Sequence, residues 1–255
     1  MSSQHNYLLL VEYDGSGYSG WQKQPGAVTV QGEIEKAFDK LGLKVNALAA
    51  GRTDKGAHAL GQAVGVSFKK DTGKDYDLRY RLNAVLPKKI SIISAEKKNS
   101  SFNPRFEAKR KKYRYVIWNR PWRSVWRGMN AWHVTQPLDT ARMIKASRFL
   151  LGSHDFSAFD ASGSTQPNKQ VNVESIDIVE RDGKITVTFT ADRFLYKMVR
   201  NIVGTLVEAG KGNIDPRQLK DILLCRNRRA AGPTAPAKGL FLEEIMFYEK
   251  QKRKA

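Results

Sequence analysis

The sequence predicts an α+β protein made of two tandem ferredoxin-like β-α-β-β-α-β units, packed as pseudo-equivalent halves with a groove between them. Two observations lead to this fold. Segments with alternating apolar residues and segments with apolar residues at helical spacing follow one another in the same order in each half. The length of 255 residues suits one large domain or two of ordinary size, and the repeated order favours two. We place the halves at residues 1–107 and 108–255.

The first half is predicted to contain a strand, a helix, two strands, a helix and a strand. These elements cover, in order, residues 7–13, 30–41, 45–50, 62–68, 78–86 and 90–95. The glycine-rich segment after the first strand indicates a flexible loop. Thr29 is placed to cap the first helix, Gly42 to end it, and Pro87 to stop the second helix.

The second half repeats this order, although its residues do not visibly repeat those of the first. The corresponding elements are predicted over residues 112–118, 140–151, 171–180, 185–191, about 194–209 and 240–248. A further short helix is expected after Pro216. Asp182 and Gly183 form a strong hairpin turn between the two central strands.

The two halves differ at the link between their central strands. A two-residue turn serves in the second half, whereas the first half uses the whole segment from Gly51 to Gly61. A loop that is longer than the connection of its two strands requires is more often functional than structural. We therefore look for chemistry in Gly51-Arg52-Thr53-Asp54-Lys55-Gly56.

Two interpretations of this loop compete. As a turn, Gly51 and Gly56 supply unusual backbone angles, Asp54 caps a backbone N–H group, and Arg52 is solvated or pairs with Asp54. As a site, Arg52 keeps Asp54 ionised and oriented, because a nearby positive charge favours the carboxylate form. Such a carboxylate can act as a nucleophile or a base on a sugar. The length of the loop favours the site.

The charge balance points to a polyanion as partner. Lys and Arg outnumber Asp and Glu by 44 to 25, so the formal net charge is +19. The run Lys109–Tyr115 interleaves cations with tyrosines, which suits the phosphates and unpaired bases of RNA. The same run also fits a solubilising edge strand. Basic clusters at 121–127, 226–229 and 250–254 favour a broad phosphate-binding surface, the last of them as a frayed end.

The sequence argues against several other kinds of site. Cys225 is the single cysteine, so the chain can form neither an internal disulfide nor a cysteine-based metal centre. The four histidines lack ligand spacing, and we predict no metal. The first apolar run, 7–11, is too short for a secretion signal or a membrane span. We expect a cytoplasmic protein.

The helix predicted from about residue 194 has one apolar stripe and one basic side. Arg193, Lys197 and Arg200 share the basic side. A solvated helix face is the preferred explanation for Arg193 and Lys197. Arg200 is a candidate second cation for Asp54, but helical spacing does not by itself bring the two together.

Several short motifs occur in a characteristic order and spacing. They are Glu12-Tyr13-Asp14-Gly15 with Gly20-Trp21-Gln22, Gly51-Arg52-Thr53-Asp54 with Gly56 and His58, Arg110–Tyr115, Met198–Gly204 and Gly239–Leu242. Each motif is weak alone, but as a set they are highly specific. With them, the chain resembles the tRNA pseudouridine synthase A family over nearly its whole length.

The resemblance implies an isomerase that makes pseudouridine at nucleotides 38, 39 and 40 in the anticodon stem-loop of tRNA. It implies a homodimer that works without cofactor or metal. Asp54 would be the catalytic aspartate, Arg52 its neighbour in the site, and Arg200 its basic partner. The groove between the two halves would then be catalytic.

The resemblance also suggests how the RNA is held. Tyr113 would stack on the target uracil, while Arg110, Lys112 and Arg114 of the same run would contact the substrate. His58 is interpreted as structural.

The sequence departs from the family pattern at Lys55, at Ala57 and in the segment 166–171, which lacks an expected arginine. These differences leave the aspartate untouched. Two alternatives to the main hypothesis remain at this stage: a non-catalytic RNA-binding or ribosome-associated protein, and a pseudouridine synthase that acts on a different RNA. The intact Arg52-Thr53-Asp54 loop argues against the first.

Overall fold

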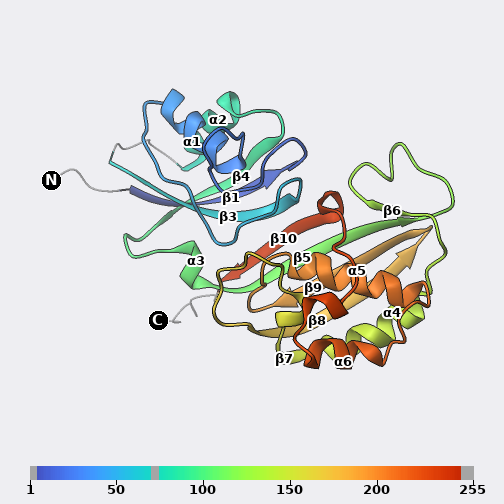
Figure 1. Cartoon of the computed structure of the whole chain (residues 1–255). Helices are drawn as coiled ribbons and strands as arrows, with labels where there is room; N and C mark the ends of the chain where they lie inside the picture. Colours follow the sequence, from blue (N-terminus) through green and yellow to red (C-terminus); the bar gives the residue numbers. More distant parts are fainter. Residues whose placement is uncertain (1–4, 70–74, 248–255) are drawn as a thin grey trace, which may run out of the picture. The chain divides into compact units, whose positions relative to one another are not determined.

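The computed structural model describes residues 5–69 and 75–247 and has a mixed α+β fold. Ten strands and six α-helices lie in this part of the chain. The chain divides into two compact units (Figure 1). The first contains the described residues up to 110 and those from 242 onward, and the second contains residues 111–241. The predicted tail at 250–254 and Tyr248 lie outside the described residues.

In the first unit, three long antiparallel strands lie in the order β4 (Ile90–Lys98), β1 (His5–Tyr13) and β3 (His58–Phe68). The strand β10 (Leu240–Phe247) follows β3, and the short β2 (Leu48–Ala49) also pairs with β3. The helices α1 (Val30–Lys40) and α2 (Asp75–Val85) lie together on one face of these strands (Figure 1). A short helix, α3 (Pro104–Glu107), follows β4.

The helix α1 shows how local sequence determines the start, the buried face and the end of one element of the first unit. Thr29 caps it, since its side chain accepts a hydrogen bond from the Gly32 N–H at 3.2 Å. Gly42 follows with a left-handed φ of +72°, where glycine carries no steric penalty. Ile34 and Phe38 recur on the buried face of the helix and are fully enclosed in the core. The predicted cap, face and stop are all confirmed.

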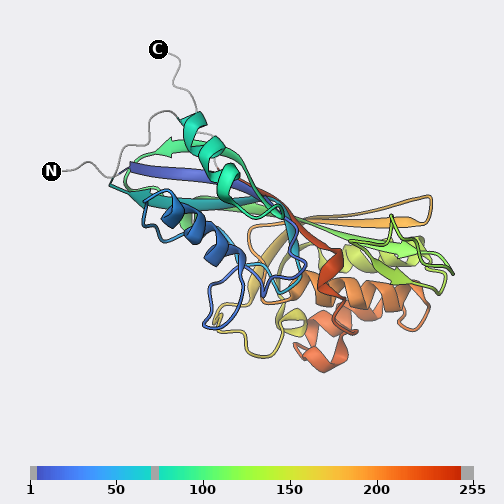
Figure 2. The ribbon, with the colours of Figure 1, turned by 90° about the horizontal axis from the view of Figure 1, so that it is seen from above.

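In the second unit, β5 (Ala108–Asn119), β9 (Lys184–Ala191), β8 (Gln170–Arg181) and β7 (Gly152–Asp155) follow one another as antiparallel neighbours. The short β6 (Trp132–Val134) pairs in parallel with the end of β5. The helices α4 (Thr140–Ser147), α5 (Met198–Gly210) and α6 (Gln218–Leu224) lie on one face of this sheet (Figures 1 and 2). The apolar stripe of α5 is buried there.

Most of the predicted elements are confirmed to within a few residues, and the Asp182-Gly183 turn has the expected positive φ values of 53° and 74°. The α+β class is therefore right. Three details were wrong. The second strand is reduced to Leu48–Ala49, β3 begins at His58 rather than Gln62, and α5 begins at Met198. The link between β2 and β3 thus covers residues 50–57, which is shorter than predicted but still longer than a tight turn.

Candidate active site

The loop at residues 50–57 carries the predicted Asp54. At its start, the Ala50 N–H donates to the Ala63 carbonyl at 2.9 Å, and near its end the Ala57 N–H donates to the Asp54 carbonyl at 3.1 Å. Gly56, inside that closing turn, has a φ of +79°, as expected for a glycine that permits a left-handed backbone. Gly51 does not have a positive φ, so the prediction of unusual angles was right for Gly56 alone.

The strand and loop at residues 13–21 hold this segment in place. The Trp21 N–H donates to the Thr53 carbonyl at 3.1 Å, and the Tyr13 hydroxyl lies 2.7 Å from the Thr53 hydroxyl. Gly20 has a φ of +87°, and a Cβ there would lie 2.8 Å from the Thr53 carbonyl oxygen. The glycines that indicated a flexible loop in the sequence instead allow two backbones to approach closely. The residue before Asp54 is therefore held by hydrogen bonds from both its main chain and its side chain.

Tyr13 remains neutral at this position. Burial raises the pKa of Tyr13 to about 12, and its hydrogen bonds with Thr53 and Gln62 oppose that rise. Gln62 also donates from Nε2 to the Gly51 carbonyl at 2.7 Å. Both ends of the Gly51-Arg52-Thr53 segment are thus tied to buried side chains of β1 and β3.

His58, interpreted from the sequence as structural, is buried against the loop that follows β1. It is 2% exposed, and its Nδ1 lies 3.1 Å from the Gly15 N–H and 3.0 Å from Asp14 Oδ1. Because one nitrogen cannot accept and donate at once, Nδ1 makes only one of these two hydrogen bonds at a time. Burial acts to raise the pKa of Asp14, but hydrogen bonds from Ser16 and the Lys89 ammonium outweigh it and lower that pKa.

The three charged residues of the loop, Arg52, Asp54 and Lys55, are at least partly exposed. Asp54 is half-buried and Arg52 is exposed, while Thr53 between them is buried. A carboxylate is thereby presented on a backbone that is anchored on each side. This arrangement suits a reactive group that must approach a substrate without moving far.

Tyr113 lies in β5 and is 7% exposed. Its ring makes an edge-on contact with Phe194, with centroids 5.0 Å apart and planes at 81°. Lys112 and Arg114 flank it, so they project to the opposite face of the strand. The Arg114 guanidinium lies 5.1 Å from the centre of the Phe241 ring on that face.

Arg110 is the remaining predicted member of the basic run. It is exposed in β5 and shares the strand face of Lys112 and Arg114. Three of the predicted RNA contacts therefore form a row on one face, and Tyr113 belongs to the other face.

Arg200 is held by a segment that sequence reasoning missed. Its Nε donates to the Ala235 carbonyl at 2.7 Å, and its own carbonyl accepts from the Ala235 N–H at 3.1 Å. A Cβ at Gly204, one turn further along α5, would lie 1.6 Å from the Pro233 carbonyl oxygen. A helical glycine followed later by the proline-rich segment 233–236 was the available signal in the sequence.

The same segment accounts for Tyr115. Its hydroxyl donates to the Pro236 carbonyl at 2.7 Å. Burial raises the pKa of Tyr115, and the positive charge of Arg200 opposes this rise. Arg200 therefore has a defined setting within the second unit, beside β5.

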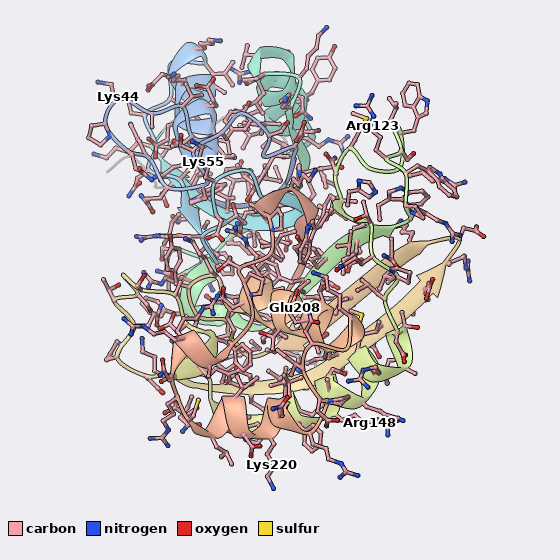
Figure 3. All side chains as sticks on the ribbon, turned by 45° about the vertical axis from the view of Figure 1, so that its right-hand side comes forward. Lys44, Lys55, Arg123, Arg148, Glu208 and Lys220 are labelled. Carbon is pink, nitrogen blue, oxygen red and sulfur yellow. The ribbon has the colours of Figure 1, made fainter. Side chains whose placement is uncertain are left out.

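Exposed cations occur in both units. Figure 3 labels five of them, Lys44, Lys55, Arg123, Arg148 and Lys220, together with the less exposed Glu208. The basic charge is spread over the surface and is not confined to the run in β5. Such a distribution suits a large polyanion.

Comparison with known proteins identifies the family. The sequence profile of a family described as tRNA pseudouridine synthase matches residues 9–107 and 146–248. A protein named tRNA pseudouridine synthase A from a Thermoanaerobacter species is 43% identical over 244 residues, which cover 95% of this chain and 99% of that protein. A protein of the same name from Acetivibrio thermocellus is 41% identical over 244 residues, which also cover 95% of this chain and 99% of that protein.

The chain belongs to the tRNA pseudouridine synthase family.

Membership in the tRNA pseudouridine synthase family confirms the predicted enzyme class, an isomerase that acts on tRNA. Within residues 5–69 and 75–247, no three His, Cys, Asp or Glu side chains are arranged to hold a metal ion. Every helix in the same residues is too short or too polar to cross a membrane.

Proposed function

We propose that this pseudouridine synthase isomerises uridine at nucleotides 38, 39 and 40 in the anticodon stem-loop of tRNA, with Asp54 as the reactive group. One observation carries the assignment of Asp54. Asp54 is half-buried, while Thr53 beside it is fixed by Trp21 and Tyr13. The choice of nucleotides rests on the resemblance to the family.

The proposed reaction needs only groups that the chain supplies. The bond between N1 and C1′ of uridine breaks, a bond between C5 and C1′ forms, C5 loses a proton and N1 gains one. There is no redox change and no external group, so we propose no cofactor. Asp54 can add to the base, attack C1′ or remove a proton from C2′, and each route needs its ionised form. We assign Arg52 and Arg200 as the basic partners of this carboxylate in the site.

The target nucleotide must leave its stack to reach the carboxylate. Extrusion costs on the order of a few kcal/mol. We assign Tyr113 to stack on the extruded uracil, which is worth roughly 1 to 3 kcal/mol and offsets much of that cost. The edge contact with Phe194 supports this role, because it already restricts the tyrosine ring. Binding of the uracil therefore costs little further side-chain entropy.

The row formed by Arg110, Lys112 and Arg114 is assigned to the phosphates of the substrate. These side chains share the strand face opposite Tyr113, so they suit backbone contacts better than contacts with the stacked uracil. Loss of any one of them should weaken tRNA binding and reduce its salt dependence.

We propose the tandem ferredoxin-like arrangement for the fold. In its support, the first and third strands of each unit pair antiparallel, β1 with β3 and β5 with β9. The second and third strands also pair antiparallel, β2 with β3 and β8 with β9. A homodimer and a cytoplasmic location are proposed on the family resemblance.

The test compares wild type with Asp54→Ala and Asp54→Asn. Both variants should bind an anticodon stem-loop within about threefold of wild type, yet lose more than a thousandfold in pseudouridine formation, as expected when a reactive group is removed. Near-normal turnover by either variant would refute the role of Asp54. Asp77→Asn, an exposed carboxylate on α2, is the matched control and should keep full activity.

The choice of RNA needs a separate experiment. Mapping of pseudouridines in total RNA from a deletion strain should show losses at tRNA nucleotides 38, 39 and 40. Losses confined to another RNA would support the alternative substrate instead. An absence of pseudouridine formation by purified wild-type protein on tRNA would favour a non-catalytic RNA-binding protein.

A further inference from the structure

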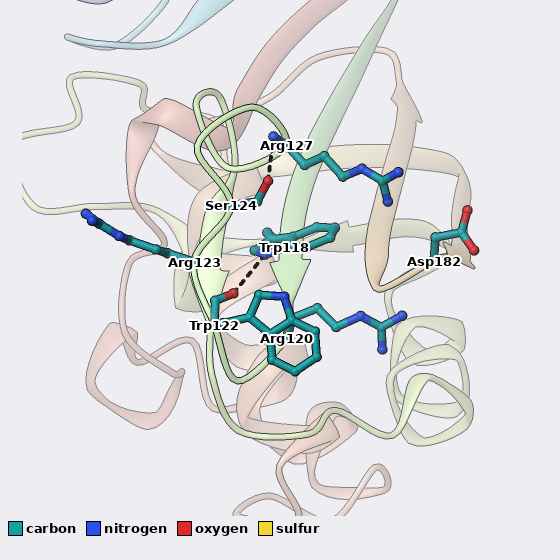
Figure 4. Close-up of a pocket in the computed structure, with 7 residues that line it drawn as sticks. All are labelled: Trp118, Arg120, Trp122, Arg123, Ser124, Arg127 and Asp182. Atoms are coloured by element: carbon teal, nitrogen blue, oxygen red, sulfur yellow. Dashed lines mark hydrogen bonds between the residues drawn. The ribbon is translucent and has the colours of Figure 1, made fainter.

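A hollow of about 600 Å³ lies beside the loop between β5 and β6. It is lined by Trp118, Arg120, Trp122, Arg123, Ser124 and Arg127, with Asp182 of the neighbouring hairpin at its edge (Figure 4). All of these residues belong to the second unit. None of them has a role in the reaction proposed above.

The base of the hollow is a fixed structure. Trp118 is 5% exposed, and its indole N–H donates to the Trp122 carbonyl at 3.1 Å. The Arg127 guanidinium lies 5.8 Å from the centre of the Trp118 ring. The Arg127 N–H donates to the Ser124 hydroxyl at 3.0 Å, and the Gly128 N–H to the Ser124 carbonyl at 3.1 Å. The loop therefore presents its side chains from a hydrogen-bonded turn.

The charge of the hollow is positive. Three guanidinium groups and one carboxylate line it, so its formal charge is +2. Across the described residues, none of the three arginines forms an ion pair. Figure 4 shows Arg120 and Arg127 on either side of the Trp118 ring, both extending toward Asp182, whereas Arg123 points away. Both guanidinium groups therefore face the hollow and are available to an anion that enters it.

An aromatic surface accompanies this charge. Trp122 is 65% exposed, although its carbonyl is anchored to Trp118. An exposed indole held by its main chain offers a stacking face for an unpaired base. A phosphate group beside a planar base is the chemistry of a nucleotide.

The position of the hollow separates it from the target base. Trp118 is five residues beyond Tyr113 in a stretch of β5 whose pairing with β9 has no irregularity. At about 3.3 Å per residue, the two positions are roughly 16 Å apart. Trp118 also lies on the strand face of Lys112 and Arg114, the row assigned to RNA phosphates.

We propose that this hollow is a second RNA-binding site, which holds an unpaired nucleotide of the tRNA other than the target. Arg120 and Arg127 bind its phosphate, and Trp122 stacks on its base. The inference rests on the proposed function, because it takes tRNA as the ligand. A guanidinium pair joined to an exposed indole recognises RNA without reading its sequence.

A second copy of the chain is the competing occupant, because Val125, Trp126 and Met129 of the same loop are also exposed. Charge argues against it. A symmetric contact places the same patch on both sides. Six guanidinium groups would then face two carboxylates, in a protein whose net charge is already +19.

The test measures binding of full-length tRNA by Arg120→Gln/Arg127→Gln at several salt concentrations. We expect Kd to rise about tenfold or more, and the slope of log K against log salt to fall by about 1.4 for two single-strand phosphate contacts. The matched control is Arg148→Gln/Arg217→Gln, which removes two exposed arginines elsewhere in the same unit. It should change Kd less than twofold. A Kd and slope equal to those of the control would overturn the proposal.

Stacking is tested separately with Trp122→Ala and Trp122→Phe. The first should weaken tRNA binding about fivefold or more, and the second should restore most of it. Equal losses in the two variants would overturn the stacking role. If Arg120→Gln/Arg127→Gln loses thermal stability, Arg127→Gln alone, at an exposed position, provides the phosphate test.

Two further measurements separate the possible failures. Sedimentation of each variant without RNA detects self-association, and a shift to smaller species that parallels the loss of tRNA binding would overturn the proposal in favour of a protein contact. Kd is measured without turnover. If wild type forms pseudouridine and the double variant binds tRNA as tightly as its control does, the second site is refuted and the proposed function is not.

Discussion

Replacing Gly20 by Ala should disturb catalysis through the backbone of the Asp54 loop. Gly20 has a φ of +87°, and its added Cβ would lie 2.8 Å from the Thr53 carbonyl oxygen and 3.2 Å from the Asp54 carbonyl carbon. Gly17 is a matched control in the same segment, since it also has a φ of +87° but nothing lies within 4 Å of its added Cβ. Both substitutions place an alanine in the left-handed region, but only Gly20→Ala also brings its methyl group against the Thr53 carbonyl.

The size of the effect follows from these distances. A left-handed alanine costs about 1 to 2 kcal/mol, which both variants should lose in stability. Ordinary contact begins near 3.4 Å, so the Thr53 carbonyl must move by about 0.6 Å to accept the methyl group of Gly20→Ala. A displacement of about 1 Å near the reacting atoms can cost a factor of 10² in rate. We therefore expect Gly20→Ala to react about tenfold more slowly than Gly17→Ala.

The assay is single-turnover pseudouridine formation with saturating enzyme, alongside urea unfolding of both variants. Saturation removes differences in tRNA affinity, and the unfolding curves verify that both variants are folded at the assay temperature. Rates within twofold of each other would refute the reasoning, because the contact with Thr53 is the feature that distinguishes the two positions.

Three other predictions follow from described contacts. Tyr113→Phe keeps the ring and its contact with Phe194, so the rate should fall less than about threefold, and a loss above about a hundredfold would show that the hydroxyl transfers a proton. Because the folded pKa of Tyr13, about 12, lies above its unfolded value of 10.0, its stabilisation is present below pH 10 and is lost as pH rises toward 12, at about 1.4 kcal/mol per pH unit. Between pH 10 and 12, the free energy of unfolding measured with urea should fall less steeply for Tyr13→Phe than for wild type. Equal decreases would show that Tyr13 is not the source of this pH dependence. Gly204→Ala should cost about 3 kcal/mol or more, since its methyl group meets the Pro233 carbonyl. Gly32→Ala in α1 should cost less, since its added Cβ would lie 3.1 Å from a side-chain oxygen, that of Thr29, and similar unfolding midpoints would contradict the clash.

The fold was predictable where the spacing of apolar residues in the sequence matches the faces of helices and strands that are buried in the structure. Failures occurred where a backbone group had a tertiary partner. Ala47 was predicted to be in a strand, but its N–H donates to Glu35 of α1, and pairing with β3 is limited to Leu48 and Ala49. The Tyr196 N–H donates to Asp160 and Lys197 is left-handed, so α5 starts later than its apolar stripe suggests. One sequence does not reveal such distant partners.

The loop proposed to carry the reactive residues was predictable from the sequence, but its supporting contacts were not. Asp54 and Arg52 were singled out because their loop is longer than a hairpin requires, and the structure retains that difference. The contacts of Gly20 with Thr53 and of Gly204 with Pro233 were missed. A glycine in a sequence indicates freedom of the backbone, but it gives no information about which distant chain occupies the space of the missing side chain.

The path of the chain through β10 also has a consequence for biosynthesis. The described residues from 242 onward belong with those up to 110, and a Cβ at Gly61 of β3 would lie 2.8 Å from the Glu243 carbonyl oxygen. Residues 111–241 must therefore leave the ribosome before the unit that carries Asp54 receives its last strand. At about 5 to 20 residues per second, these 131 residues impose a delay of roughly 7 to 26 s. The edge of β3 that receives β10 stays open during this delay, and the nascent chain cannot complete its first unit until residues 111–241 have been synthesised.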